Sequence, residues 1–176
     1  MQLEVYADAE EVELFLNGKS AGKAIITEKD RYKAAFELLW RPGTIEAVAY
    51  RSGTVCGRCA LTSAAGAPSL SVEPECAEVS LRQREVVFVP IRAAGENGQT
   101  LLQRKDTVSV CIDGPAELLG FGSDDPVTEE GFAAPQHRLY DGRALLVLRP
   151  ISTGQITVTA ASQTLPAASA SITVRE

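Results

Sequence analysis

Apolar and polar residues alternate along most of this chain, with the period of β-strands that have one buried face. The alternation is clearest over residues 11–16, where Val, Leu and Leu share one side and Glu, Glu and Phe the other. Asn17 and Gly18 follow, and both residue types readily adopt the positive φ that a two-residue hairpin turn requires. The chain then returns through a second strand-like segment that ends at Thr27. This pattern predicts a β-hairpin.

The same alternation predicts further strands throughout the chain. No window has a sustained helical period, apart from a single turn over residues 127–132. In the first part of the chain, the predicted strands cover residues 3–7, 11–16, 21–27, 33–40, 44–50 and 54–61. In the second part, they cover residues 70–73, 86–93, 107–113, 117–121, 143–149, 155–161 and 170–174.

Small and turn-forming residues at positions 63–68 separate the two groups of strands. We therefore expect two domains, residues 1–65 and residues 66–176. Many short strands within about 105 residues are typical of an immunoglobulin-like sandwich, so the expected fold class is all-β, with two immunoglobulin-like β-sandwich domains in tandem. The alternation predicts these core residues: Leu14, Leu16, Phe36, Trp40, Val87, Val89, Val108, Val110, Leu146 and Leu148.

Composition removes several classes of function. The chain has 176 residues, 45% of them hydrophobic, and a net charge of −6, which argues against disorder and against binding to a nucleic-acid backbone. No apolar run approaches the roughly 20 residues of a membrane span, so no membrane partner is expected. The first residues read as a strand, and we expect no signal peptide.

The four cysteines do not form a familiar metal or redox motif. Cys56 and Cys59 make a CxxC pair, but a zinc ribbon needs a second pair, and His137 is the only histidine. The pair also lies within a predicted strand, whereas a thioredoxin-type site needs a helix N-terminus. We therefore predict free thiols, no metal, no cofactor and a cytoplasmic location.

Four carboxylates cluster in one loop, namely Asp124, Asp125, Glu129 and Glu130. Their oxygens could hold Ca²⁺, although their spacing does not match an EF-hand. A glycosidase acid/base pair is disfavoured because a loop lacks the fixed separation that this chemistry needs. The simplest interpretation is that Asp125 forms an Asx-turn before Pro126 and that the other carboxylates are solvated.

The aromatic residues of the first part leave two alternatives open. Phe36 and Trp40 share a strand face, as expected for a sandwich core, but these two residues could also form a platform for sugar rings together with Tyr32 and Tyr50. His137 lies in a polar context and is predicted to be a surface residue rather than a general base.

Four stretches resemble the C-terminal region of glycoside hydrolase family 2 enzymes of the β-galactosidase type. They are VELFLNGK at 12–19, WRPGTIEAVAY at 40–50, LTSAAG at 61–66 and GFGSDDP at 120–126, the last followed by GRALLVLR at 142–149. They occur in the family's order along nearly the whole chain. Ser123 and Asp124 depart from the family's pattern, in which Asn and Gly are usual at these positions.

The resemblance implies a non-catalytic fragment with a structural or accessory role. The family's two catalytic glutamates lie on a (β/α)₈ barrel, which needs about 250 residues, so no residue here matches them. The implied partner is the catalytic barrel of a parent enzyme, with carbohydrate and a homo-oligomer formed through the parent as further expectations. A carbohydrate-binding module and an immunoglobulin-like adhesion domain are the alternatives.

The segment 120–132 is the predicted interaction loop of the second domain. It combines three glycines with four carboxylates and with Phe121 and Phe132, which is more structured than a passive tether requires. The residues expected to act there are Phe121, Asp124, Asp125 and Phe132, whereas Trp40 is the candidate sugar platform of the first domain.

Overall fold

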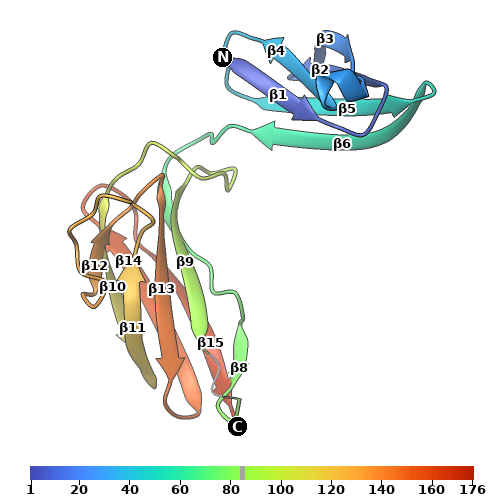
Figure 1. The fold of residues 1–176 in the computed structure, drawn as a ribbon. Helices are drawn as coiled ribbons and strands as arrows, with labels where there is room; N and C mark the ends of the chain where they lie inside the picture. Colours follow the sequence, from blue (N-terminus) through green and yellow to red (C-terminus); the bar gives the residue numbers. More distant parts are fainter. Residues whose placement is uncertain (84–85) are drawn as a thin grey trace. The chain divides into compact units, whose positions relative to one another are not determined.

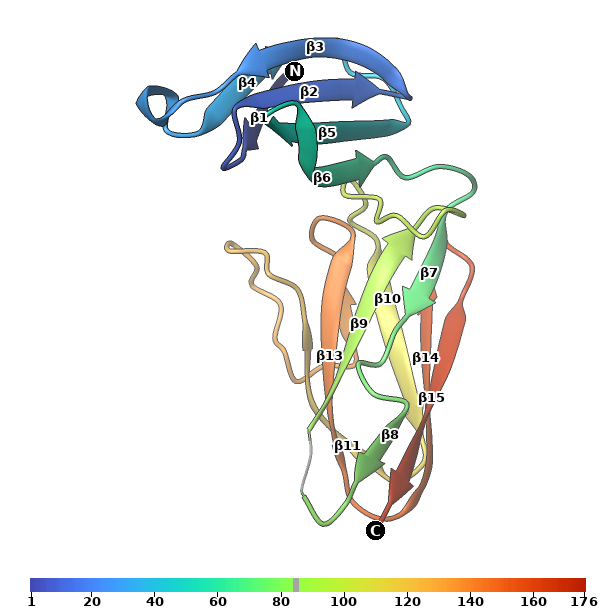
Figure 2. The same cartoon turned by 90° about the vertical axis from the view of Figure 1, so that its right-hand side faces the viewer.

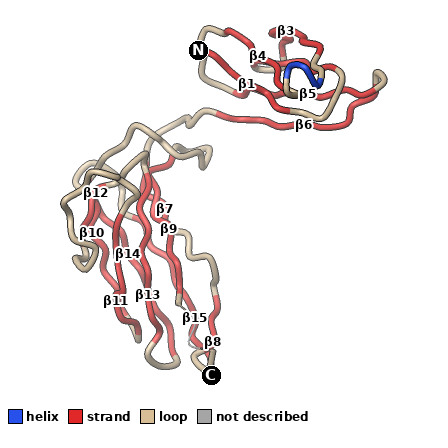
Figure 3. The backbone as a smooth tube through the Cα atoms, viewed as in Figure 1, coloured by secondary structure: helices blue, strands red, loops and turns tan. Residues whose placement is uncertain are grey.

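The computed structural model describes residues 1–83 and 86–176 and has an all-β architecture (Figure 1). Within these ranges it contains fifteen strands and a single 3₁₀ turn, Glu28–Asp30, which the sequence did not predict (Figure 3). None of the helical structure in the described part is long and apolar enough to cross a bilayer. The chain divides into two compact units, Met1–Ser63 and Ala64–Glu176. The predicted boundary after residue 65 falls in the same strand-free segment between these units.

The first unit is built from two antiparallel sheets. One pairs β1 with β4, and the other has the order β3-β2-β5-β6. The six strands are β1 (Gln2–Tyr6), β2 (Glu11–Leu16), β3 (Lys19–Ile25), β4 (Lys33–Glu37), β5 (Thr44–Arg51) and β6 (Thr54–Thr62). The inner faces of both sheets supply the core of this unit, which includes Val12, Leu14, Ile26, Ala34 and Phe36.

The predicted hairpin is confirmed at its turn. Asn17 and Gly18 have φ values of 51° and 75°, and β2 and β3 pair antiparallel on either side of them. The Asn17 amide also fastens the turn to the start of β5, since its Nδ2 donates to the Pro42 carbonyl (3.1 Å) and its Oδ1 accepts from the Thr44 N–H (2.8 Å). A Cβ on Gly43 would lie 1.8 Å from that Oδ1, so this close approach requires glycine.

The second unit is a sandwich of two sheets (Figure 2). A four-stranded sheet has the order β11-β13-β9-β7, and a five-stranded sheet has the order β12-β10-β14-β15-β8. All its pairings are antiparallel except that of β15 with β8. The strands are β7 (Ser69–Val72), β8 (Glu78–Ser80), β9 (Val87–Ala94), β10 (Thr107–Asp113), β11 (Ala116–Gly122), β12 (Gln136–Arg138), β13 (Arg143–Pro150), β14 (Gly154–Ser162) and β15 (Ala168–Arg175).

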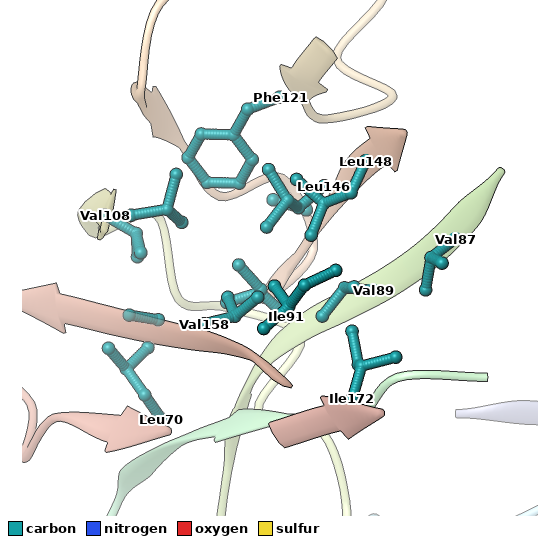
Figure 4. Packing of buried hydrophobic residues seen from close by; sticks show 14 of the residues in the cluster. Leu70, Val87, Val89, Ile91, Val108, Phe121, Leu146, Leu148, Val158 and Ile172 are labelled. Atoms are coloured by element: carbon teal, nitrogen blue, oxygen red, sulfur yellow. The ribbon is translucent and has the colours of Figure 1, made fainter. Parts of the chain in front are cut away.

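The core of the second unit lies between these sheets (Figure 4). Fully buried side chains from the four-stranded sheet, such as Val89 and Leu146, pack with Ile156 and Ile172 from the five-stranded sheet. The predicted core residues of this unit are confirmed as buried: Val87, Val89, Val108, Val110, Leu146 and Leu148. Burial of apolar area on this scale is the main favourable term in folding such a domain.

Several predicted elements were wrong in detail. The predicted helical turn over 127–132 does not form, and the short strands β8 and β12 were missed. Leu14 and Phe36 are buried as predicted and Leu16 is half-buried, but Trp40 is 64% exposed. The reason is that β4 ends at Glu37 and its backbone bonds to the β1 side reach only Leu38, whose N–H donates to the Met1 carbonyl, so Trp40 has no partner strand beside it.

A charged network joins two connections of the second unit. Arg104 holds the Asp106 carboxylate through its Nε and Nη2, both at 2.7 Å, and its Nη2 also lies 2.9 Å from Thr164 Oγ1. The Thr164 hydroxyl donates to the same carboxylate. Partial burial raises the pKa of Asp106, but the hydrogen bonds from Arg104 and Thr164 outweigh it and hold the pKa below its usual value.

Replacing this carboxylate tests the network. We expect Asp106→Asn to lower the free energy of unfolding by about 1–3 kcal/mol near neutral pH, because hydrogen bonds to charged groups are the strong ones. The folded pKa is depressed, so this contribution is complete above the unfolded pKa of about 3.9 and is lost as the pH falls toward the folded pKa. Urea denaturation of both proteins near pH 7 and at about pH 3 measures this convergence.

Asp113→Asn is the matched control for this measurement, since Asp113 is exposed and has no side-chain partner among the described residues. If the free energies of unfolding of Asp106→Asn and the unsubstituted chain differ by the same amount at both pH values, the effect is not ionic in origin.

Candidate functional site

A hollow of the second unit lies on the outer face of its four-stranded sheet. It has a volume of ≈ 510 Å³, and its lining includes Pro90, Gly120, Gly122, Phe132, Leu145 and Val147. β9, β11 and β13 supply most of these residues, and Phe132 comes from the segment between β11 and β12. The predicted interaction loop therefore borders the hollow.

A β-bulge in β11 creates the open floor. The register passes from Leu118↔Leu148 to Gly120↔Val147, which leaves Leu119 as the extra residue. Beyond the bulge the faces of β11 are exchanged, so Phe121 pairs with the buried Leu146 and turns into the core, where it is fully buried. Gly120 and Gly122 then face outward and leave the space above β13 open.

The outward positions beside these glycines are apolar. Leu145 pairs with Pro90 and Val147 pairs with Phe88 across β13 and β9. Leu145 and Phe88 are each 40% exposed. The solvated face of an antiparallel sheet normally carries polar residues, so this apolar strip has the character of a surface that another group covers.

Phe132 forms one wall of the hollow and is held rigidly. Its carbonyl accepts from the Phe121 N–H at 2.7 Å, and its ring stacks on the His137 ring with 5.6 Å between centroids and 6° between planes. His137 in turn meets the Phe121 ring edge-on, at 6.2 Å and 70°. A Cβ on Gly122 would come within 2.2 Å of Phe132 Cδ1, so only a glycine leaves room for this ring.

His137 is fully buried, which overturns its predicted surface position. The short strand β12 places it opposite Val108 at the edge of the five-stranded sheet, between the two phenylalanine rings. Its Nδ1 lies 3.0 Å from the Arg138 carbonyl, a geometry that assigns the proton to Nδ1. Within the described residues its Nε2 has no hydrogen-bond partner, so it is not bonded to a serine or cysteine nucleophile there.

The acidic loop is organised by its backbone. Asp125 Oδ1 accepts from the Val127 N–H at 3.1 Å, which confirms the predicted Asx-turn. Glu130 is exposed, as expected, but it is also bonded: its Oε2 accepts from the Arg138 N–H (3.1 Å) and lies 3.4 Å from His137 Nδ1. In the part of the chain that the structure describes, no cluster of three or more acidic, histidine or cysteine side chains could hold a metal ion.

Two charged groups at the rim have no ion-pair partner among the described residues, namely Arg143 and Asp124. Arg92 lies opposite Arg143 in the register of β9 and β13. It is neutralised by the Glu73 carboxylate and also donates to Thr100 Oγ1 at 3.2 Å. The Ser71 hydroxyl and then the Arg92 guanidinium hold the pKa of Glu73 below its usual value. Ser123 also lines the hollow, and its Oγ is buried without a partner among the described residues.

The aromatic candidates of the first unit do not gather at one place. Phe36 lies in the core, whereas Tyr50 is half-buried with Lys23 Nζ 5.3 Å from the centre of its ring. Tyr32 and Trp40 are exposed. The four cysteines are exposed and free, and Cys56 and Cys59 both lie on β6.

The Asx-turn gives a direct test of the loop. We expect Asp125→Ala to lower the free energy of unfolding by about 0.5–2 kcal/mol, the usual cost of removing a side chain that caps backbone N–H groups. Asp124→Ala is the matched control, because Asp124 caps nothing among the described residues, and its effect should stay within about 0.5 kcal/mol. Thermal unfolding of the two variants measures the difference, and equal effects would contradict the role of the turn.

Comparison with protein families gives two adjacent matches. Residues 70–171 match the family described as glycoside hydrolase family 2 C-terminal domain 5. Residues 1–57 match a domain of unknown function, DUF4982.

Individual relatives extend over nearly the whole chain. A β-galactosidase of Bacteroides ovatus is 26% identical over 172 residues, which are 97% of this chain and 20% of the relative. The crystal structure of a glycosyl hydrolase family 2 member from Bacteroides cellulosilyticus superposes with a TM-score of 0.92 at 30% identity, covering 99% of this chain and 23% of that one. A β-glycosidase from Bacteroides vulgatus shares the fold, with a TM-score of 0.86 at 23% identity, over 99% of this chain and 22% of that one.

This chain thus spans about a fifth of the length of these relatives. The domain 5 match alone covers more than half of the residues, and its immunoglobulin-like strands are those that form the hollow and its walls. This chain belongs to glycoside hydrolase family 2 and spans C-terminal accessory domains of that family.

Proposed function

We propose that this chain is the non-catalytic C-terminal part of a β-galactosidase-like enzyme and that it supports the enzyme's catalytic barrel. The observation that carries the proposal is the match to a β-galactosidase over 97% of this chain. The more similar solved structure is described only as a family 2 glycosyl hydrolase, so the galactoside specificity is the narrower part of the proposal.

The chemistry of glycoside hydrolysis supports an accessory role. The reaction needs two carboxyl groups at a fixed separation on either side of the scissile bond. In the acidic loop, Asp125 is engaged in its turn and Glu130 is bonded to the backbone of β12. Neither carboxylate is therefore free to face a substrate as half of such a pair.

The exposed thiols bear on location. All four cysteines are accessible, and the oxidising conditions outside the cytoplasm favour disulfide formation by such thiols. We therefore include a cytoplasmic parent enzyme in the proposal.

A carbohydrate-binding module is the second candidate, because Trp40 is 64% exposed and aromatic rings stack on the apolar faces of sugars. Trp40 is the only tryptophan, so the tryptophan fluorescence of the chain, excited where tyrosine does not absorb, reports on it alone. As an accessory fragment, the chain should keep its emission spectrum unchanged when galacto-oligosaccharides are added. A saturable shift of the Trp40 emission would favour the binding module instead.

Turnover tests the main proposal. We expect the isolated chain to release no chromophore from aryl β-galactosides or β-glucuronides. The full-length enzyme that contains it should hydrolyse both faster than the isolated chain, and the β-galactoside faster than the β-glucuronide. The physical reason is that a β-sandwich supplies no barrel to hold two catalytic carboxylates. Activity that co-purifies with the isolated chain would contradict the accessory role, and a full-length enzyme that prefers the glucuronide would contradict the specificity.

A further inference from the structure

We infer that the hollow above β9, β11 and β13 is the surface through which this chain docks on the catalytic part of its parent enzyme. The partner segment that it fits presents a large apolar side chain next to a carboxylate. This inference rests on the proposed function and adds to it the contact surface and the chemistry of the group that fills it.

The first argument is the apolar floor. Pro90, Leu145 and Val147 offer no hydrogen-bonding side chain, although they face outward from a sheet. A sugar in this hollow would bury hydroxyl groups against hydrocarbon, which is costly without hydrogen bonds. Burying an aliphatic or aromatic side chain of a protein partner against the same surface makes the free energy of binding more favourable. The floor therefore favours a protein segment over a carbohydrate.

The second argument is the charge at the rim. Glu73 already neutralises Arg92, but Arg143 has no acidic partner within the described ranges. A carboxylate on the partner would complete an ion pair there, next to an apolar surface that excludes water and strengthens the attraction. Asp124 carries the opposite charge on the same rim. The two charged groups together therefore favour one orientation of the partner segment over the reverse orientation.

The third argument is that the hollow is preformed. The Phe132 wall is held by stacking on His137, and the loop below it is held by the Asp125 turn. A rigid site loses little conformational entropy on binding.

The occupant follows from length and charge together. About four-fifths of each relative lies outside the region that matches this chain, so most of the surface available to cover the hollow belongs to the rest of the parent enzyme. A free sugar would leave the apolar floor unmatched. We therefore assign the catalytic part of the same polypeptide as the occupant of the hollow.

Hydroxyl-radical footprinting with mass spectrometry tests this assignment without any substitution. In the isolated chain, the exposed side chains of Phe132 and Leu145 should be oxidised readily. In the full-length enzyme, their oxidation should fall to the level of Leu146, which is fully buried in both proteins. Unchanged oxidation of Phe132 and Leu145 in the full-length enzyme would overturn the inference.

A charge reversal tests the chemistry of the partner. Arg143→Glu in the full-length enzyme should restore oxidation of Phe132 and Leu145 toward the rate seen in the isolated chain, because it places two carboxylates together. Arg41→Glu is the matched control, since Arg41 of the first unit is also exposed and unpaired among the described residues. Equal oxidation in the two variants would overturn the acidic character of the partner.

Two further outcomes would also reject the assignment. Protection that appears in the isolated chain as its concentration rises would identify a second copy as the occupant, and protection by added galacto-oligosaccharide would identify a sugar. Turnover is measured separately on the same full-length enzyme. A protein that protects the hollow but hydrolyses no β-galactoside would leave the docking surface in place and reject only the proposed specificity.

Discussion

The bulge at Leu119 is the constraint on which the candidate site depends. A strand presents alternate residues to opposite faces, so one inserted residue exchanges the faces of everything that follows. Before the bulge, Glu117 faces outward and pairs with Arg149. After it, Phe121 turns inward and two glycines turn outward. The same residue therefore completes the core of the sandwich and opens the hollow above it.

The contacting rings of Phe121, His137 and Phe132 link the bulged strand β11 to the other sheet. β11 belongs to the four-stranded sheet and β12 to the five-stranded sheet, and the segment between them must cross from one to the other. The buried histidine anchors that crossing through ring contacts on both sides and through its bond to the Arg138 carbonyl. What the structure shows of His137 is therefore its packing: the imidazole is buried and contacts both phenylalanine rings.

The outer sheet faces of the two units differ in the residues that they carry. In the first unit, the outer face of the larger sheet carries a charged ladder in which Lys23 bridges Glu11 and Glu13. Such exposed ion pairs add little stability but keep a sheet face soluble. The second unit replaces this ladder with an apolar floor and keeps charges only at the rim. This contrast within one chain supports the docking surface proposed for the outer face of the second unit.

The sequence by itself determined the local features of this protein. The alternation over Glu11–Leu16 and Thr107–Asp113 predicted both strands at their observed bounds, and Asn17-Gly18 and Asp125 predicted their turns. Each of these depends on residues within a few positions of one another, so a short stretch contains the whole cause. The resemblance to family 2 likewise rested on short ordered motifs.

Only the tertiary structure decided burial at the places that matter for function. Phe121 reads as sharing a face with Leu119 until the register with β13 reveals the bulge. His137 sits in a polar stretch and is buried because the Phe121 and Phe132 rings enclose it, whereas Trp40 continues an alternation and is exposed because β1 no longer pairs beside it. The reason is physical: a side chain is buried by atoms that are close in space, and those atoms come from strands far away in the sequence.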